Sequence, residues 1–171
     1  MPINKFSTII LWGIKMSDIG IVEVEPQLVI GMRKTGKYEQ IAVMLPELFQ
    51  YTFDKGIEIT GGPIFVCHEA GEEEAMKADR EGTADIEVAI PIANRVEDTE
   101  IVKCYELPGG KMVKTIHKGP YEECGPTYQE LFAWIAEKGL NITGPTREVY
   151  LNDPAEVPPE EILTEIYAPV D

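Results

Sequence analysis

The order of apolar and polar residues along the chain predicts eight short β-strands and two main helices. β-branched residues, together with apolar and polar side chains that alternate with a period of two, indicate the strands. Two strands precede each helix and two follow it. The predicted strands are Val22–Pro26, Leu28–Lys34, Ile64–Glu69, Ile86–Ile92, Ile101–Leu107, Lys111–Lys118, Glu148–Asn152 and Thr164–Val170.

Apolar residues at helical spacing and the residues at the helix ends predict the two helices. The residues that form the sheet-facing sides are Leu48, Phe49 and Thr52 in the first helix and Leu131, Phe132 and Ile135 in the second. The helices end at Lys55–Gly56 and Lys138–Gly139, where glycine suits a left-handed cap and lysine suits the negative end of the helix dipole. Pro126 fits the first turn of the second helix, whereas Pro46 either starts or kinks the first.

The chain contains an internal repeat. Residues Gly36–Val66 align with Gly119–Val149 at a constant offset of 83, without a gap, and 12 of the 31 aligned positions are identical. The strand "IEVAIPI" near the end of the first copy matches "TEIYAPV" at the end of the second. The first copy also carries a longer acidic segment, which we interpret as a loop with Glu72–Glu74 solvated. A repeat of this kind predicts one architecture used twice.

We therefore expect an α+β fold made of two ββαββ units that are related by a pseudo-two-fold axis. An antiparallel sheet and two main helices would surround a central cleft, the kind of place that small-molecule sites favour. The repeats would span about 19–98 and 99–171, and together they would form one domain over 19–171. Residues 1–18 would be an N-terminal extension, because no small-residue cleavage site follows their short apolar run and Met16 could equally be the start.

The composition limits the classes of partner. Thirty acidic and fifteen basic residues among 171 give a formal net charge of −15. This charge opposes direct binding to nucleic acids and to anionic membranes, since both rest on neutralising phosphates. Three widely spaced cysteines, with no C-x-x-C pair, argue against a disulfide framework and favour a cytoplasmic location. No apolar run approaches the roughly 18–20 residues of a membrane span.

The segment "REVYL" differs in chemistry between the two copies. Strand alternation places Glu148 and Tyr150 on one face, where the first copy has Phe65 and Cys67. A carboxylate among apolar and aromatic side chains is costly unless it is paired or protonated. Glu148 either faces water on a half-exposed sheet, forms an ion pair with Arg147 or a lysine, or is held ready for a cationic ligand.

Aromatic rings near Glu148 would add cation–π contacts of about 0.5–2 kcal/mol each to the charge–charge attraction. The predicted ligand-binding residues are Glu148, Tyr150, Trp134, Tyr121, Tyr128 and Phe65. For Trp134, on the second helix, core packing remains a strong alternative.

Other reactive side chains give weaker signals. His68 and His117 have no metal-ligand spacing with the cysteines, so we expect neither a metal nor a cofactor. A surface or hydrogen-bonding role is expected for His117. Cys124 adjoins a predicted helix start, which could lower its pKa, but no partner base is visible and we propose no nucleophile.

Four motifs of the second copy resemble those of one family. They are G-P-Y-E before the helix, L-F-x-W-I within it, G-P-x-x-E-x-Y-x-x-D-P after it and a closing E-I-Y-x-P-V. The chain resembles the gyrase-inhibitor-like (GyrI-like) small-molecule-binding domains, which also occur as effector-binding domains of AraC-type and MerR-type transcription regulators. The resemblance is close over Ile101–Val170 and extends through the first copy to about Ile19.

The resemblance implies two SHS2-like repeats around a ligand-holding cleft, in which Glu148 contacts cationic lipophilic ligands. Tyr150 and Trp134 fall on motif positions. No helix-turn-helix pattern is recognised, so the chain resembles the stand-alone members. We expect a cytoplasmic binding protein for lipophilic, cationic small molecules, including drugs or toxins.

Two alternatives stay open. The same cleft could hydrolyse cyclopropane-containing electrophiles, with Glu148 as general base and Tyr121 or Tyr150 as acid, roles that these residue types suit. The protein could also modulate gyrase by protein contact, because its acidic surface could compete with DNA for a basic groove. The sequence identifies no protein partner.

Overall fold

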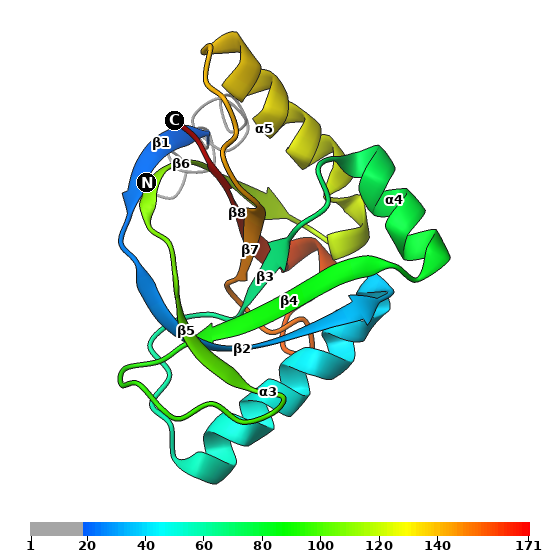
Figure 1. Ribbon diagram of the computed structural model, residues 1–171. Helices are drawn as coiled ribbons and strands as arrows, with labels where there is room; N and C mark the ends of the chain where they lie inside the picture. Colours follow the sequence, from blue (N-terminus) through cyan, green and yellow to red (C-terminus); the bar gives the residue numbers. More distant parts are fainter. Residues whose placement is uncertain (1–18) are drawn as a thin grey trace, which may run out of the picture.

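The computed structural model describes residues 19–171 as a strongly curled antiparallel sheet with helices packed against it (Figure 1). The predicted N-terminal extension, residues 1–18, lies outside the described residues. The eight strands are β1 (Gly20–Val24), β2 (Gln27–Gly36), β3 (Ile64–Cys67), β4 (Ala84–Pro91), β5 (Lys103–Leu107), β6 (Gly110–Lys118), β7 (Thr146–Tyr150) and β8 (Leu163–Pro169). Each overlaps one predicted strand, with its ends shifted by a few residues, so the antiparallel α+β prediction is confirmed.

The sheet order is β1-β6-β8-β7-β3-β4-β2-β5, and every neighbouring pair is antiparallel. The first strand of each half pairs with the other half: β1 lies beside β6, and β5 lies beside β2. The halves meet at the sheet centre, where β3 pairs with β7 and Phe65 lies directly opposite Glu148. Directly opposed residues point to the same face, so Phe65 and Glu148 share one surface of the sheet.

The two predicted helices are α3 (Ile41–Lys55) and α5 (Gly125–Glu137). Gly56 ends α3 in the left-handed region, at φ 64°, as the predicted glycine cap requires. Pro46 lies inside α3 and does not start it. Each helix follows a short 3-10 turn, η1 (Tyr38–Gln40) before α3 and η2 (Tyr121–Glu123) before α5.

A third helix, α4 (Glu72–Glu81), replaces the predicted acidic loop. The prediction was wrong because three consecutive glutamates occupy the first helical turn, where the positive end of the helix dipole stabilises their charge. Gly82, at φ 69°, caps the far end in the left-handed region. Ala78 is buried and joins α4 to the core around α3.

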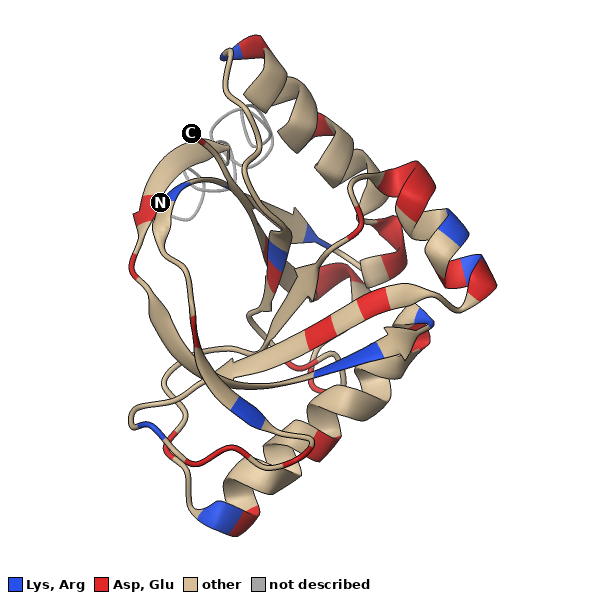
Figure 2. Ribbon diagram, viewed as in Figure 1, with Lys and Arg blue, Asp and Glu red and all other residues tan. Residues whose placement is uncertain are grey.

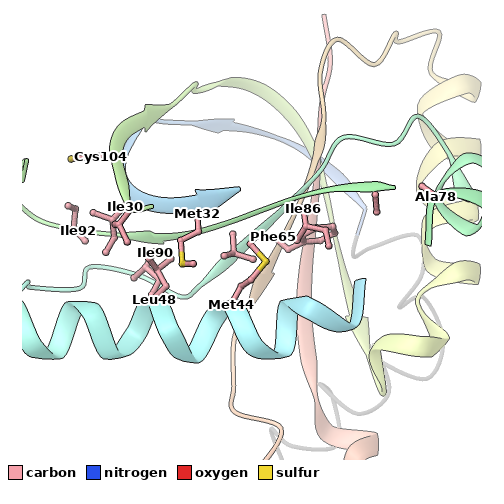
Figure 3. Packing of buried hydrophobic residues seen from close by; sticks show 13 residues of the cluster. Ile30, Met32, Met44, Leu48, Phe65, Ala78, Ile86, Ile90, Ile92 and Cys104 are labelled. Atoms are coloured by element: carbon pink, nitrogen blue, oxygen red, sulfur yellow. The ribbon is translucent and has the colours of Figure 1, made fainter. Parts of the chain in front are cut away.

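The core lies mainly between the helices and the sheet. Met44 and Leu48 of α3 pack on Met32, Ile90 and their neighbours from the strands (Figure 3). A separate cluster joins α5 to β6 and β8, through Leu131, Ile135, Val113, Ile166 and Ala168. The face opposite the helices carries a third cluster that includes Val66, against which the half-buried Val149 packs.

Two further observations bear on the chemistry of the chain. In the part that the structure describes, no helix is long and apolar enough to cross a membrane. The three cysteines are free: Cys104 and Cys124 are buried, and Cys67 is half-buried.

Candidate ligand-binding groove

A groove of about 1780 Å³ lies between the helices and the centre of the sheet. Its floor comes from β3 and β7, and its walls come from α3, α4, α5 and η2. Gln129 Nε2 of α5 donates a hydrogen bond to Glu72 Oε2 of α4 at 3.1 Å, so these two walls are in contact. The predicted cleft between the helices is therefore present, with α4 as an additional wall. Its volume exceeds the roughly 300–1,000 Å³ of ordinary small-molecule pockets.

Glu148 lies on this floor and is held by two phenols. The Tyr128 hydroxyl donates a hydrogen bond to Oε2 at 2.5 Å, and the Tyr150 hydroxyl donates one to Oε1 at 3.1 Å. Burial raises the pKa of Glu148, and the two phenol hydrogen bonds and the nearby His117 oppose this rise only in part. The carboxylate is thus desolvated and hydrogen-bonded, and no lysine or arginine among residues 19–171 forms an ion pair with it.

The predicted ion pair between Glu148 and Arg147 does not form. Neighbouring residues of a strand point to opposite faces, and Arg147 Nη2 donates instead to the carbonyl oxygen of Pro108 at 2.6 Å. The alternative in which Glu148 simply faces water on a half-exposed sheet does not describe it either, because the side chain is half-buried and hydrogen-bonded to two tyrosines.

Three tyrosines surround the Glu148 carboxylate. The rings of Tyr121 and Tyr150 pack edge to face, with centroids 5.1 Å apart. Burial, followed by the charge of Glu148, raises the pKa of Tyr128 and of Tyr150 well above the ordinary value. Both phenols therefore keep their protons at neutral pH and act as hydrogen-bond donors.

His117 positions the turn that carries Tyr121. Its Nε2 lies 2.9 Å from the Pro120 carbonyl oxygen, which can only accept, so Nε2–H donates. Its Nδ1 lies 2.8 Å from Thr127 Oγ1 in α5. The expected hydrogen-bonding role is confirmed, whereas the expected surface location is wrong, since His117 is only 5% exposed.

Gly119 turns the chain from β6 towards Tyr121 at φ 125°, a conformation that favours glycine. This turn explains the glycine of the G-P-Y-E motif. His117, two residues before Gly119, was the sequence signal for a structural contact at this turn. Its role could not be predicted, because its partner Thr127 lies ten residues further along the chain, in α5.

The other end of the groove contains a second tyrosine–carboxylate pair, which the sequence prediction missed. Tyr38 donates to Glu69 Oε1 at 2.5 Å, and its ring packs edge to face on Phe65, with centroids 5.8 Å apart. Phe65 lines the floor as predicted and is 4% exposed. Tyr38 aligns with Tyr121 in the repeat, so the alignment was the signal that could have identified it.

Trp134 is the predicted site residue that lies apart from the groove. It packs against the α5 cluster, and Lys138 Nζ lies 5.4 Å from the centre of its ring. Trp134 follows the groove-lining Tyr128 by six residues, which at 3.6 residues per turn rotates it by about 120° around α5. Trp134 therefore serves the packing of α5, which was the alternative role that the sequence left open for it.

The pKa of Cys124 is raised to about 12, not lowered as its place beside a helix start suggested. Burial is the largest cause, and the charges of Glu148 and Glu122 add to it. The thiol is therefore protonated at neutral pH, and the protonated form is not the nucleophilic one.

The groove is strongly acidic. Seven carboxylate residues line it: Glu39, Glu69, Glu72, Asp79, Glu122, Glu148 and Asp153. Among residues 19–171, no lysine or arginine lines it, and Figure 2 shows acidic segments gathered where α4 begins. The described residues contain no group of three or more histidine, cysteine, aspartate or glutamate side chains arranged to hold a metal ion.

Several solved structures share this fold. The C-terminal domain of EcmrR is 21% identical, covers 90% of this chain and 96% of its own, and superposes with a TM-score of 0.79. A hydrolase from Listeria innocua is 18% identical, with coverages of 90% and 92% and a TM-score of 0.67. SAV2435 bound to tetraphenylphosphonium is 14% identical, with coverages of 90% and 93% and a TM-score of 0.55.

A search of the curated proteins finds no match. The model of the GyrI-like small molecule binding domain, in contrast, matches residues 17–171, which include every strand and helix described above. The motif-based resemblance is confirmed: the chain belongs to the family of GyrI-like small-molecule-binding domains.

Proposed function

We propose that the groove binds lipophilic small molecules that carry a positive charge, and that the protein serves as a cytoplasmic drug, toxin or effector-binding module. The observation that carries this proposal is the desolvated Glu148 carboxylate, which Tyr128 and Tyr150 hold on a floor where no lysine or arginine of residues 19–171 lies beside it. A cation entering the groove would supply the missing counter-charge.

The energetics favour a cation over a neutral ligand. Opposite charges attract more strongly away from water, and cation–π contacts with the tyrosine faces add about 0.5–2 kcal/mol each. The apolar side chains of α3 that line the groove, including Leu45 and Phe49, would cover the lipophilic part of the ligand. A similarly folded protein, SAV2435, is bound to tetraphenylphosphonium, so this cation is a reasonable first probe.

The repeated sequence supports the same proposal. We propose that the two halves arose by duplication of an SHS2-like ββαββ unit and that a pseudo-two-fold axis passes between Phe65 and Glu148. These residues differ by the repeat offset of 83 and also face each other across β3 and β7. The cation site would then lie on the axis, where both halves contribute side chains.

Isothermal titration calorimetry with tetraphenylphosphonium and with a neutral lipophilic compound of similar size tests the proposal. Glu148→Gln should weaken binding of the cation by about tenfold to hundredfold, since it removes the counter-charge but keeps the side-chain shape. Binding of the neutral compound should change little. Glu122→Gln is the matched control, because it removes one negative charge from the groove rim without touching the Tyr128–Glu148–Tyr150 cluster. Equal losses for cation and neutral compound would rule out the counter-charge role.

A second candidate function is hydrolysis of a strained electrophile in the same groove, with Glu148 activating water. A carboxylate with a raised pKa beside phenols supports it, as does the shared fold of the Listeria innocua hydrolase. However, each Glu148 oxygen already accepts a hydrogen bond from a phenol, and such hydrogen bonds reduce the basicity of a carboxylate. Binding is therefore the preferred function. Product analysis after incubation with a cyclopropane-bearing electrophile decides between the two, because binding without turnover removes the hydrolase for that substrate class.

A further inference from the structure

The groove floor contains two carboxylates, and each accepts a hydrogen bond from a tyrosine beside an aromatic pair. Glu148 accepts from Tyr128 and Tyr150, and Tyr121 packs on Tyr150. At the other end, Glu69 accepts from Tyr38, whose ring packs on Phe65. Resting on the proposed function, we propose that the groove binds elongated ligands with two positive charges joined by an apolar linker, one charge beside Glu148 and the other beside Glu69.

The sheet register sets the spacing of the two subsites. Phe65 faces Glu148 across the β3–β7 pair, and Glu69 follows Phe65 by four residues in the direction of β3. Glu69 lies at a bend two residues beyond the end of β3, so an extended chain at about 3.3 Å per residue gives the largest spacing of the two backbone positions along the strand, about 13 Å. Cys67 lies between them; burial is the largest cause that raises the pKa of its thiol, and the charges of Glu148 and Glu69 add to the rise.

The space between the subsites suits an apolar linker. Phe65 and Cys67 form the floor there, and Ile41, Leu45 and Phe49 of α3 line the same groove. Burying a linker against them would contribute about 25 cal/mol for each Å² of apolar surface. The volume of about 1780 Å³ also exceeds what one drug-sized ligand needs, so a single cation beside Glu148 would leave the Glu69 end unfilled.

The two subsites differ in how their carboxylates are fixed. Glu148 is held by two phenols alone, whereas Glu69 also accepts a hydrogen bond at Oε2 from the backbone N–H of Asp85, at 3.1 Å. The Glu69 carboxylate is thus held in place by the backbone of β4 before any ligand arrives. Glu148 has three tyrosines around it and Glu69 has one, so a single-charge ligand should occupy the Glu148 end first.

Calorimetric titration of bis-quaternary ammonium alkanes of increasing linker length, beside mono-quaternary ammonium compounds with the same alkyl chains, tests the inference. Linking two charges makes the second contact intramolecular. Affinity for the bis-cations should therefore pass through a maximum at an intermediate linker length, and should there exceed that of the mono-cation by about tenfold or more, at one ligand per protein.

Glu69→Gln should remove this gain and leave the affinity for the mono-cation unchanged within about twofold. Glu122→Gln, which makes the same charge change at the groove rim, should preserve the gain. If Glu69→Gln disturbs folding through the Asp85 contact, the linker series in the unmodified protein still decides, because a groove in which only Glu148 pairs with a ligand charge produces no maximum along the series.

The outcomes separate this inference from the proposed function. Mono-cations that bind, together with bis-cations that bind no more tightly at any linker length, would overturn the two-charge inference and leave the proposed function standing. The same holds if Glu69→Gln weakens both ligand types equally. If neither ligand type binds to the unmodified protein, the proposed function fails and the two-charge inference fails with it.

Discussion

The two halves of the groove are built from aligned segments, yet only one of them holds a carboxylate at the centre of the sheet. Phe65 and Glu148 occupy the same position of the repeat and face each other across β3 and β7. Glu148 receives hydrogen bonds from Tyr128 and Tyr150. The residues aligned with these two tyrosines in the first half are Leu45 and Cys67. A desolvated carboxylate needs donors, so three differences between the halves act together as one site.

The aligned residues Tyr38 and Tyr121 have different roles in the two halves. Tyr121 packs on Tyr150 in the second half, whereas Tyr38 donates to Glu69 in the first. Both residues lie on a 3-10 turn before a helix, so the backbone places them alike. What each hydroxyl and ring contacts depends on the strand opposite, and this is why the groove has two unlike ends.

The largest loss of stability is expected when a charge is placed in the first half. Phe65→Glu should lower the free energy of unfolding by about 3 kcal/mol or more, because the new carboxylate would be buried opposite Glu148 with no phenol donors. Phe65→Leu, which reduces packing and adds no charge, should cost only about 1 kcal/mol. Urea denaturation measures both. Similar losses for the two variants would show that the first half can accept a charge after all.

Removing the charge from the second half should have the opposite effect on stability. Burial raises the pKa of Glu148 above its usual value near 4.5, so its ionised form is disfavoured in the folded state. Its contribution to stability is complete below the ordinary pKa and is lost as the pH rises through the raised one. Glu148→Gln should therefore melt about 2–4 °C higher at neutral pH, roughly 1 kcal/mol for a chain of this size.

The pH dependence of this stability gain provides its control. At a pH below about 4.5, where Glu148 is protonated in folded and unfolded chains alike, the difference in melting temperature between Glu148→Gln and the unmodified protein should shrink towards zero. Thermal melts followed by circular dichroism at pH 7 and pH 4 measure it. A difference in melting temperature of the same size at pH 7 and pH 4 would show that burial does not destabilise the ionised carboxylate.

Removing one phenol should shift the pH range over which Glu148 can bind a cation. The hydrogen bond from Tyr128 lowers the pKa of Glu148, so Tyr128→Phe should raise that pKa further. Tetraphenylphosphonium affinity at mildly acidic pH should fall by about twofold to tenfold, in line with about 0.5–1.5 kcal/mol for one hydrogen bond.

Two other hydroxyls serve as comparisons for this variant. Tyr150→Phe should have a smaller effect, since its hydrogen bond is longer, at 3.1 Å against 2.5 Å. Tyr51→Phe, on α3 and outside the groove lining, should have none. Affinity measured across pH 5–8 would contradict the assignment if all three variants behaved alike.

The smallest effect is expected at Trp134. Trp134→Phe should change ligand affinity by less than about twofold, because the ring packs on the α5 cluster and lies apart from the groove. It should cost stability instead, by about 1 kcal/mol, through lost packing. Calorimetry and thermal melts check the two parts. A large loss of affinity with unchanged stability would show that Trp134 belongs to the ligand site.

Local sequence patterns were enough to predict the eight strands, the two main helices and the residues at the centre of the candidate site. Period-two alternation located the eight strands, and the Lys–Gly endings located α3 and α5, because these signals depend on residues only a few positions apart. The repeat alignment singled out Glu148 and Tyr150, since it displayed a carboxylate where the other copy has a phenylalanine. It did not reveal α4, where helix-dipole stabilisation outweighed the repulsion that a run of glutamates suggests.

Which of these elements meet depends on contacts between distant parts of the chain. The exchange of β1 and β5 between the halves, the contact of Tyr128 with Glu148 and the pairing of Tyr38 with Glu69 all join residues far apart in the chain. Trp134 shares a helix with Tyr128, and both pack against the α5 cluster, but of the two only Tyr128 also lines the groove. A local pattern records whether a residue is apolar or polar, whereas its neighbours are selected by burial and pairing across the whole folded chain, and these become fixed only when the two halves close on each other.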